Sequence, residues 1–496
     1  MLLSKENLKK INGDAVLLPD EALLNLPEKV LQFGTGVLLR ALPDYFIDKA
    51  NRCGKFNGRI VVVKSTDGGD AGAFDRQDGL YTLCMRGITD GKSIQESVVC
   101  SSVNRVLSAA TDWQLVLECA ANPELAVIIS NTTEIGIELV KEPVSSNPPV
   151  SYPAKLLAFL YERFKVFGGS VQSGFVIIPT ELISDNGNKL KAIVQELAEW
   201  NELDKKFINW LLACNQFCNS LVDRIVPGLP DAGKKAALEQ ELGYQDDLLI
   251  MSEVYSLWAI EGNEQVKSVL SFAAADPGVV IADDITVFKE LKLRLLNGTH
   301  TLSCGVAFLA GFTTVKEAMN DAILSQYIKQ LMLEEIAVAI PFNVEEKQAK
   351  EFAVKVLDRF SNPSIEHQWI SITLNYTAKL KMRVVPVLQY YYKLYKKVPE
   401  NIATGFAAWL LFMHEVKKEG NNYRGELKGK AYPVKDEMAS LFFDQWHNLT
   451  PDNLVKAALS DINLWGADLT QLDGFTENVT FKLKAIMQQG IMAVIA

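Results

Sequence analysis

The chain has 496 residues, of which 48% are apolar and 22% charged, so it is long enough for roughly two or three globular domains with buried cores. Its formal net charge of −10 argues against a nucleic-acid-binding surface, and no apolar run reaches the roughly 18 residues of a membrane span. The seven cysteines lack the spacing of a metal site, and their odd number without an N-terminal apolar segment predicts free thiols in a reducing cytoplasm.

The first motif joins a strand, a glycine turn and a helix. Residues 29–33 form a short apolar run, and a helical run follows the turn. In dinucleotide-binding folds the first glycine of such a turn permits a tight bend, and the second lets the backbone approach a pyrophosphate at a helix N-terminus. Leu39 stands where a third glycine is usual, so the motif is incomplete. The residues that we expect to bind the cofactor here are Phe33, Gly34, Thr35 and Gly36.

A second strand is predicted for residues 59–63. An acid that binds the adenine ribose hydroxyls is expected near the end of this strand, where the sequence has Lys64 and Ser65. Asp67 is the nearest candidate. A basic Lys64 would suit a ribose 2′-phosphate, so these residues leave the choice between NAD and NADP open.

A second cofactor-binding loop is predicted after a later strand. Residues 81–86 and 93–98 predict a β-hairpin, and residues 125–129 predict another buried strand. The segment that follows lies at the carboxyl end of this strand, where open α/β sheets bind ligands. An ordinary turn that caps the next segment is the alternative. The residues expected to contact the cofactor are Ser130, Asn131, Thr132 and Glu134.

Strands and helices alternate over the first 200 residues, which predicts an α/β fold. We expect a Rossmann-like domain over residues 1–283, in which the β-like stretch 244–282 extends the sheet. From about residue 284 the apolar residues recur with helical period, which predicts a mostly α-helical domain over residues 284–496. The polar, glycine-rich stretch 417–432 predicts an exposed loop between helices of this second domain.

One predicted helix carries a possible catalytic set. Its apolar residues recur at three-, four- and seven-residue intervals and are Phe288, Leu291, Leu295, Leu302, Val306 and Leu309. At about 100° per residue, Lys292, His300 and Asn297 fall on one arc beside this stripe. Gly298 costs roughly 1 kcal/mol relative to alanine in mid-helix, which suggests close approach of another group to the backbone. The alternative is a solvated polar face with a helix break at Asn297-Gly298.

Two further polar sets stand out. Asp223 and Arg224 lie in an otherwise apolar run, which predicts that they are buried or face a site, with a structural ion pair as the alternative. Lys379 and Arg383 share one face of a predicted helix, while Lys381 points away. A bidentate arginine suits a carboxylate, and a solvated basic helix is the alternative.

The remaining histidines have no comparable neighbours in the sequence. No pair of histidines has the spacing of metal ligands, so we predict no metal site. We expect these residues to be structural or exposed: His367, His414 and His447.

The polar residues of the predicted helix form a known pattern. Lys292-x4-Asn297-x2-His300 resembles the K-x4-N-x2-H catalytic signature of the mannitol dehydrogenase family, the polyol-specific long-chain dehydrogenases. The run 217–227 is similar to the F-x-N-S-x-V-D-R-I-x-P signature of the same family. The resemblance covers nearly the whole chain, from about residue 28 to about residue 490.

Further segments carry this resemblance, and one departs from it. The glycine turn with Arg40 is similar to the family's shortened glycine motif, which adds Arg40 to the expected cofactor contacts. Residues 130–136 resemble the segment S-x-T-x-T-E-x-G. In a third segment Glu181 and the residue after it replace an Asp-Asn pair, so that only Asn186 matches there.

The resemblance implies an NAD-dependent oxidoreductase that moves a hydride between nicotinamide and a secondary alcohol or ketone without a metal. Lys292 would be the general acid/base, and because a free lysine with a pKa near 10.4 is a poor base at neutral pH, partial burial would have to lower its pKa. Asn297 and Asn186 would donate hydrogen bonds to the developing oxyanion. His300 would orient a substrate hydroxyl.

The departures from the family patterns point to a branch that acts on sugar acids. A small anionic substrate would be bound by Asp223, Lys379 and Arg383, although the sequence leaves open which basic residue of the 379–383 segment contacts the carboxylate. We expect a cytoplasmic monomer or small homo-oligomer with no nucleic-acid partner and no membrane partner.

Three other functions stay open at this point. The substrate could be fructuronate or mannonate, mannitol, or mannitol 1-phosphate within the same family. An oxidative decarboxylase of the 6-phosphogluconate type also pairs a lysine with an asparagine on a helix, and it would release carbon dioxide. A non-catalytic dinucleotide-binding sensor would not need Lys292.

Overall fold

The computed structural model covers residues 1–496, and the structure is described for residues 1–65, 71–132, 136–420 and 422–496. The predictions made for Asp67 and Glu134 therefore lie outside the described residues. The chain divides into two compact units. Unit 1 comprises Met1–Gly87 and Ser93–Ile285, and unit 2 comprises Ile88–Lys92 and Thr286–Ala496. The boundary expected from the sequence lies between residues 283 and 284.

Unit 1 is built on a six-stranded sheet with the strand order β5-β2-β1-β6-β7-β8. Every neighbouring pair in this sheet is parallel, which confirms the predicted Rossmann-like fold. Its strands are β1 (Glu28–Phe33), β2 (Arg59–Lys64), β5 (Val103–Ser108), β6 (Val127–Ser130), β7 (Val176–Pro179) and β8 (Gln216–Phe217). The helices of unit 1 are α1 (Val37–Ala41), α2 (Pro43–Arg52), α3 (Ala71–Arg76), α4 (Trp113–Glu118), α5 (Tyr152–Phe167), α6 (Asn186–Trp200), α7 (Lys205–Cys214), α8 (Ala232–Leu242) and α9 (Glu264–Val269).

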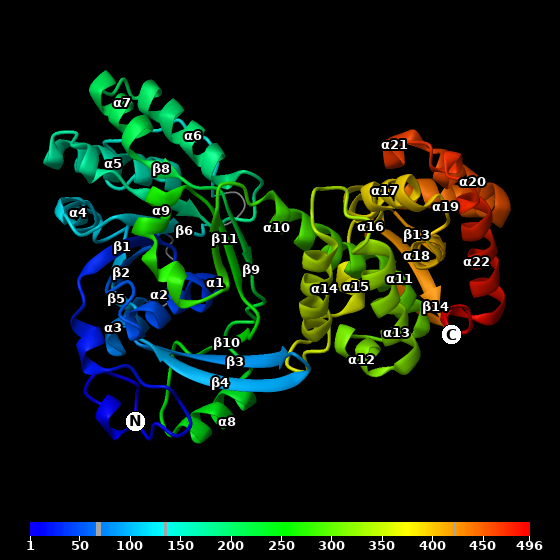
Figure 1. Ribbon diagram of the computed structural model, residues 1–496, viewed down its shortest axis with the longest axis horizontal. Helices are drawn as coiled ribbons and strands as arrows, with labels where there is room; N and C mark the ends of the chain where they lie inside the picture. Colours follow the sequence, from blue (N-terminus) through cyan, green and yellow to red (C-terminus); the bar gives the residue numbers. More distant parts are fainter. Residues whose placement is uncertain (66–70, 133–135, 421) are drawn as a thin grey trace. The chain divides into compact units, whose positions relative to one another are not determined.

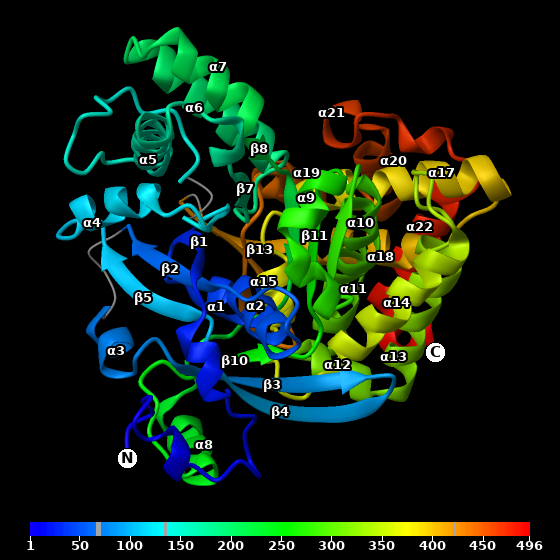
Figure 2. The same cartoon turned by 60° about the vertical axis from the view of Figure 1, so that its left-hand side comes forward.

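Both faces of the six-stranded sheet are buried, which explains why its strands are continuous apolar runs. Successive side chains of a strand point to opposite faces. Leu31 and Val63 pack in the core formed with α4, α5, α6 and α7, whereas Val30 and Val62 pack in the core formed with α1 and α2. Figures 1 and 2 show these two helical layers on either side of β1 and β2.

Two smaller sheets complete unit 1. One has the order β10-β3-β4 and the other β12-β11-β9. Their strands are β3 (Tyr81–Thr89), β4 (Lys92–Cys100), β9 (Ser220–Asp223), β10 (Ile250–Glu253), β11 (Leu257–Glu261) and β12 (Val279–Ala282). The predicted β-hairpin is confirmed as β3 and β4, seen as a long two-stranded ribbon in Figure 2. The prediction that residues 244–282 extend the main sheet is wrong, because β10, β11 and β12 pair with strands of these separate sheets.

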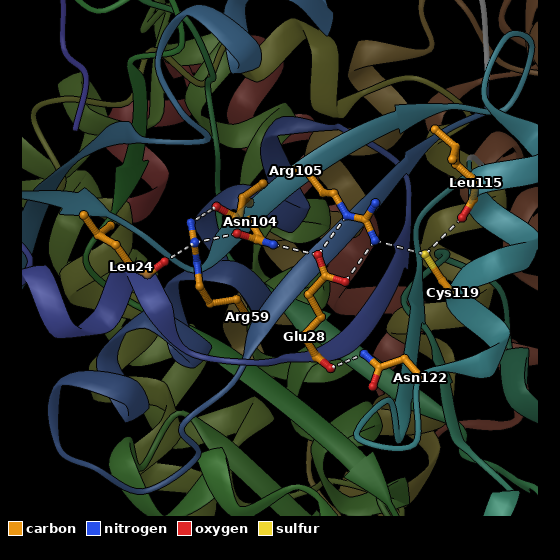
Figure 3. Close-up of polar contacts among 9 residues, drawn as sticks. Leu24, Glu28, Arg59, Asn104, Arg105, Leu115, Cys119 and Asn122 are labelled. Atoms are coloured by element: carbon orange, nitrogen blue, oxygen red, sulfur yellow. Dashed lines mark hydrogen bonds and ion pairs between the residues drawn. The ribbon is translucent and has the colours of Figure 1, made fainter. Parts of the chain in front are cut away.

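A polar network ties together the amino ends of three strands (Figure 3). The Glu28 carboxylate accepts hydrogen bonds from Arg105 Nε at 2.8 Å and from Asn104 Nδ2 at 2.6 Å. Arg59 Nη1 donates to Asn104 Oδ1 at 2.6 Å, and Asn122 Nδ2 donates to the Glu28 carbonyl oxygen at 3.0 Å. Because Glu28, Arg59 and Asn104 lie at the starts of β1, β2 and β5, the network holds the edge of the sheet opposite the glycine turn.

No helix in the described ranges of either unit is both long enough and apolar enough to span a bilayer.

Unit 2 is mostly helical, as predicted. Two π-helical segments, η6 (Lys292–Gly298) and η7 (Leu331–Ile336), interrupt the α-helices. The α-helices are α10 (Thr286–Leu291), α11 (Thr299–Ala310), α12 (Val315–Asn320), α13 (Ala322–Gln330), α14 (Glu346–Phe360), α15 (Trp369–Ile372), α16 (Tyr376–Arg383), α17 (Val385–Tyr395), α18 (Glu400–Phe412), α19 (Ala439–Asn448), α20 (Pro451–Ser460), α21 (Ile462–Trp465), α22 (Phe475–Gln489) and α23 (Ile491–Ile495).

The stretch predicted as an exposed loop, 417–432, instead forms an antiparallel sheet of β13 (Glu415–Glu419), β14 (Asn422–Leu427) and β15 (Lys430–Val434). Gly425 on β14 is directly opposite Tyr432 on β15. The Tyr432 ring stacks on Phe412 at 4.9 Å, and its hydroxyl donates to the Phe412 carbonyl oxygen at 2.9 Å. Gly425 therefore makes room for the aromatic ring of the neighbouring strand. The glycines of this stretch predict a loop from the sequence, but this one belongs to a strand.

Replacing Gly425 by valine tests this account of the small sheet. A Cβ atom at this position would lie 2.2 Å from Tyr432 Cζ, so the ring must leave its place on Phe412. We expect Gly425→Val to lower the free energy of unfolding by about 2 kcal/mol, the usual size of an overpacking defect. Urea unfolding measures the change, with Lys430→Val, an exposed position of the same sheet, as the control. An equal midpoint for both variants would contradict the account.

Candidate functional site

The glycine turn follows β1 at the carboxyl edge of the six-stranded sheet. Gly34 has a φ of +126°, and a Cβ atom there would lie 2.8 Å from the Asn131 carbonyl oxygen and 2.9 Å from Leu39 Cδ1. Only glycine meets both conditions without strain. Gly36 has a φ of −62°, and a Cβ atom there would meet no atom of the described residues within 4 Å. The backbone can therefore be approached at Gly36, which fits the pyrophosphate of a dinucleotide.

The turn lies at a switch in the strand order. The chain passes from β1 to β2 and β5 on one side of the sheet, and β6 then lies on the other side of β1. The loops after β1 and β6 therefore flank the position where open α/β sheets bind ligands. Thr35 is half-buried, whereas the Phe33 side chain is buried against Tyr152 with ring centroids 5.1 Å apart.

Glu181 fixes the loop after β6. Its carboxylate accepts hydrogen bonds from Thr132 N and Thr132 Oγ1, both at 2.9 Å, and from Ser130 Oγ at 3.1 Å. Asn131 Nδ2 donates to Thr180 Oγ1 at 3.0 Å. Glu181 is 3% exposed, and this burial raises the pKa of its carboxyl. The side chains expected to bind the cofactor are thus held by the protein itself, and the departure at Glu181 has a structural reason that the sequence did not reveal.

Arg40 packs α1 into unit 1. Its Nη1 donates to the Leu248 carbonyl oxygen at 2.6 Å, and its guanidinium lies over the rings of Tyr81 and Phe74 at 5.5 and 5.7 Å. Burial lowers the pKa of Arg40. These contacts give Arg40 a structural role, and its direct contact with a cofactor phosphate stays a prediction.

A buried carboxyl lies behind the glycine turn. Asp44 of α2 accepts a hydrogen bond from Gln32 Nε2 at 3.4 Å, and the same nitrogen donates to the Gly34 carbonyl oxygen at 3.3 Å. Asp44 is fully buried, and burial raises its pKa to about 8 against the smaller opposing effects of the Gln32 hydrogen bond and the Arg40 charge. The carboxyl is therefore mostly protonated at neutral pH.

Asn186 is committed to backbone groups. Its Nδ2 donates to the carbonyl oxygens of Pro179 at 3.0 Å, Glu181 at 3.1 Å and Ser220 at 3.2 Å, and its Oδ1 accepts from Ser220 N at 2.9 Å. Asn186 is 1% exposed. These contacts join the start of α6 to β7 and β9, which is a structural role.

Asp223 and Arg224 are both buried, as the sequence predicts. Asp223 ends β9 and is buried, opposite Leu257 of β11. The Arg224 guanidinium donates to the carbonyl oxygens of Ala41 and Glu253, the latter from Nε at 3.0 Å and Nη2 at 2.8 Å. Arg224 therefore stabilises backbone carbonyls rather than a buried carboxylate.

In unit 2, the predicted helix 288–309 consists of α10, η6 and α11. The π-helical segment η6 spans Lys292–Gly298. Hydrogen bonds in a π-helix join residues five apart, so Lys292 and Asn297 lie one turn apart on the same side. The α-helical rotation of about 100° per residue, used for the sequence prediction, does not describe this segment. Both residues are half-buried. A Cβ atom on Gly298 would meet Leu293 O at 3.6 Å and Arg383 O at 3.7 Å, so the end of α16 lies in contact with this position, and the helix continues through it without a break.

Arg294 joins the π-helical segment to α16. Its Nη1 donates to the carbonyl oxygens of Met382 at 2.5 Å and Arg383 at 3.0 Å, and its Nε donates to Glu290 Oε2 at 2.9 Å. In return, Arg383 Nη1 donates to Thr301 Oγ1 at 3.1 Å. The end of α16 is thus held against the residues of the catalytic signature.

The basic residues of α16 point in different directions, as predicted. Lys379 Nζ donates to the Ile372 carbonyl oxygen at 3.0 Å, whereas Lys381 Nζ donates to the Asn463 carbonyl oxygen at 3.0 Å. Burial, followed by the charge of Arg383, lowers the pKa of Lys379. Within the described part of the chain, neither Lys379 nor Arg383 forms an ion pair with a carboxylate.

His300 lies among aromatic rings. It stacks on Phe360 with centroids 4.0 Å apart and meets His367 and Trp369 edge-on at 5.0 and 5.9 Å. Burial, and then the charges of neighbouring basic groups, lower its pKa well below the ordinary value of 6.5, so the ring is neutral at neutral pH. Its Nδ1 is buried and has no hydrogen-bond partner among the described residues.

The sequence predicts that His367 is structural or exposed, and the structure places its half-buried ring against His300. No sequence spacing relates it to His300, because the extended segment before α15 returns to α11 only in the folded chain. Among the described residues, no group of three His, Cys, Asp or Glu side chains could hold a metal ion.

Comparisons with known proteins cover both units. Residues 28–272 match the Rossmann domain of mannitol dehydrogenase, and residues 284–487 match its C-terminal domain. An altronate oxidoreductase of Enterobacter sp. (strain 638) is 38% identical over 478 residues, which cover 95% of this chain and 96% of the relative.

Two solved structures share the fold. A D-sorbitol dehydrogenase in substrate-free form has a TM-score of 0.77 at 20% identity, with 100% of both chains covered. Mannitol 2-dehydrogenase of Pseudomonas fluorescens, in a ternary complex with NAD and D-mannitol, has a TM-score of 0.67 at 22% identity and covers 100% of this chain and 99% of its own. At these identities the likeness concerns the fold alone.

The buried carboxyl behind the glycine turn predicts a pH-dependent stability. The pKa of Asp44 is raised from 3.8 to about 8 on folding, so its stabilising contribution is complete below pH 3.8 and is lost as the pH rises through 8. Between pH 6 and 8 the free energy of unfolding should fall by about 2 kcal/mol from this group. The asparagine of Asp44→Asn cannot ionise, so the free energy of unfolding of this variant should not show this fall between pH 6 and 8.

Urea unfolding at pH 6, 7 and 8 measures the effect. Asp75→Asn is the matched control, because Asp75 is exposed on α3. An unchanged pH dependence in Asp44→Asn would contradict the assignment.

Proposed function

Because the chain belongs to the mannitol dehydrogenase family, we propose that it is an altronate oxidoreductase that interconverts D-tagaturonate and D-altronate with NAD. The observation that carries this proposal is the 38% identity with a relative of that name over 95% of the chain. An anionic substrate is further supported by Lys379 and Arg383, two cations without a carboxylate partner among the described residues.

Lys292 is the proposed general acid and base. In the reductive direction the bound nicotinamide supplies a hydride to the carbonyl carbon. The Lys292 ammonium donates its proton to the carbonyl oxygen, which becomes the new hydroxyl group. In the oxidative direction the neutral amine accepts the hydroxyl proton. Acid–base catalysis of this kind contributes typically about 10²- to 10⁴-fold to a rate.

Asn297 and His300 are proposed to assist Lys292. Asn297 lies one π-helical turn from Lys292 and would donate a hydrogen bond to the developing oxyanion. Neutral His300 has one nitrogen that donates and one that accepts, which suits the orientation of a substrate hydroxyl. Asn186 would have to give up backbone contacts to act as a second donor, so we assign the oxyanion contact to Asn297 alone.

Unit 1 is proposed to hold the dinucleotide. The backbone of Gly34, Thr35 and Gly36 would contact the pyrophosphate, and the loop that Glu181 fixes after β6 would border the same position. The carboxylate of the sugar acid would be bound by Lys379 and Arg383 in unit 2.

The first experiment follows NADH oxidation at about 340 nm with D-tagaturonate, for the wild type and Lys292→Ala. Loss of the general acid should lower kcat by at least about 100-fold and leave NADH binding intact. Lys289→Ala, three residues earlier on α10, is the matched control and should keep wild-type activity.

The outcomes separate the parts of this proposal. Activity mainly on D-fructuronate or D-fructose would keep the family and refute the substrate. Undiminished activity of Lys292→Ala would mean that another residue is the general acid. An equal loss of activity in Lys289→Ala would mean that the loss in Lys292→Ala is not specific to Lys292.

A second experiment tests the glycine turn. Gly36→Ala should leave stability unchanged, since its φ of −62° suits alanine and no described atom lies within 4 Å of the new Cβ. The added methyl group would stand where the pyrophosphate approaches, so the Kd for NADH should rise at least about 10-fold. Fluorescence titration with NADH and NADPH measures both affinities. Tighter binding of NADPH than of NADH would mean that the cofactor is NADP rather than NAD.

Gly13→Ala is the control for this titration, because a Cβ atom at Gly13 meets only Val16 O, at 4.0 Å. Equal NADH affinity in Gly36→Ala and Gly13→Ala would remove Gly36 from the cofactor site.

A further inference from the structure

The backbone around His367 is hydrogen-bonded to residues 313–315. Its carbonyl oxygen accepts a hydrogen bond from Val315 N at 2.9 Å, and Trp369 N donates to Thr313 O at 3.0 Å. Residues two apart in an extended segment point to the same side. Accordingly, His367 and Trp369 both meet His300 edge-on, with interplanar angles of 71° and 72°. The backbone therefore presents the His367 ring to His300.

Among the described residues, the His367 side chain has no hydrogen-bond partner. Trp369 is fully buried, whereas His367 is half-buried and its ring nitrogens form no hydrogen bond with any described residue. A fixed imidazole beside a candidate catalytic residue, with its nitrogens uncommitted, is therefore available to a ligand.

The charges around these rings favour an anion. The largest charge effects on His300 come from His367, Arg359, Arg383 and Lys379, and each of them disfavours protonation of His300. Lys379 has the same effect on His367. Basic groups gathered on this side of α11 produce a positive potential within a chain whose net charge is −10. A carboxylate beside these rings would be attracted by the charges of Arg383 and Lys379.

We propose that His367 is a specificity-determining residue that donates a hydrogen bond to the carboxylate of the sugar-acid substrate, beside Lys379. This inference rests on the proposed function, because it needs a sugar acid as the substrate. A purely packing role for His367 against His300 is the competing account. In that case a change at His367 would disturb the orientation of His300, and so kcat, more than substrate binding.

The test replaces His367 by phenylalanine and by glutamine. His367→Phe keeps a ring against His300 and removes both nitrogens, so the KM for D-tagaturonate should rise at least about 10-fold, with kcat within about threefold of the wild type. His367→Gln keeps a neutral donor and should recover part of the affinity. His447→Phe is the matched control, because His447 is exposed and its Nδ1 already pairs with the Phe443 carbonyl oxygen.

Competitive inhibition identifies the group that His367 contacts. D-altronate and D-altritol differ by a carboxylate in place of an alcohol group. The inhibition constant of D-altronate should rise at least about 10-fold in His367→Phe, while that of D-altritol stays within about twofold. An equal rise for D-altritol, or a fall in kcat with an unchanged KM, would overturn the proposal.

The same panel separates this inference from the proposed function. A wild type that prefers D-fructuronate, with a KM for D-fructuronate that depends on His367, would refute the substrate and support the carboxylate contact. A wild type active on D-tagaturonate, with an unchanged KM in His367→Phe, would support the substrate and refute the carboxylate contact. A wild type that neither turns over a uronate nor binds D-altronate would overturn both.

Discussion

One guanidinium, that of Arg294, fixes the part of unit 2 on which the proposed chemistry depends. The last carbonyl groups of a helix have no partner within the helix. Arg294 donates to two such carbonyls at the end of α16, those of Met382 and Arg383, and it is held in turn by Glu290. Arg383 donates back to Thr301. The π-helical segment and the basic face of α16 are therefore positioned by a set of partly buried hydrogen bonds.

In unit 1 the two edges of the six-stranded sheet have different tasks. At the amino edge, Glu28 and Arg59 belong to a network that joins β1, β2 and β5 (Figure 3). At the carboxyl edge, Gly34 permits the turn after β1, and Glu181 holds the loop after β6. The polar groups of the amino edge satisfy one another, whereas the backbone at Gly36 can be approached from outside. Binding is therefore expected at the carboxyl edge, where the strand order switches.

Local patterns predicted those elements whose structure depends on their own apolar residues. The buried runs 29–33, 59–63 and 125–129 are strands of the main sheet, and their alternation with helices predicted the Rossmann-like fold. The stretch 244–282 was correctly recognised as β-like, but its strands pair with β3, β9 and one another. The stretch 417–432 was mistaken for a loop, because the reason for Gly425 is an aromatic ring on the neighbouring strand. A propensity describes one segment, whereas strand pairing depends on two.

The sequence by itself determined which chemical groups the chain carries at fixed spacing, namely the glycine turn and the set Lys292, Asn297 and His300. Such patterns can be read because their spacing reflects backbone geometry within a few residues. Only the tertiary structure decided that the lysine and the asparagine share one π-helical turn, and that His367 lies against His300. Those features depend on long-range packing and on desolvation of polar groups, which arise only when distant segments exclude water together.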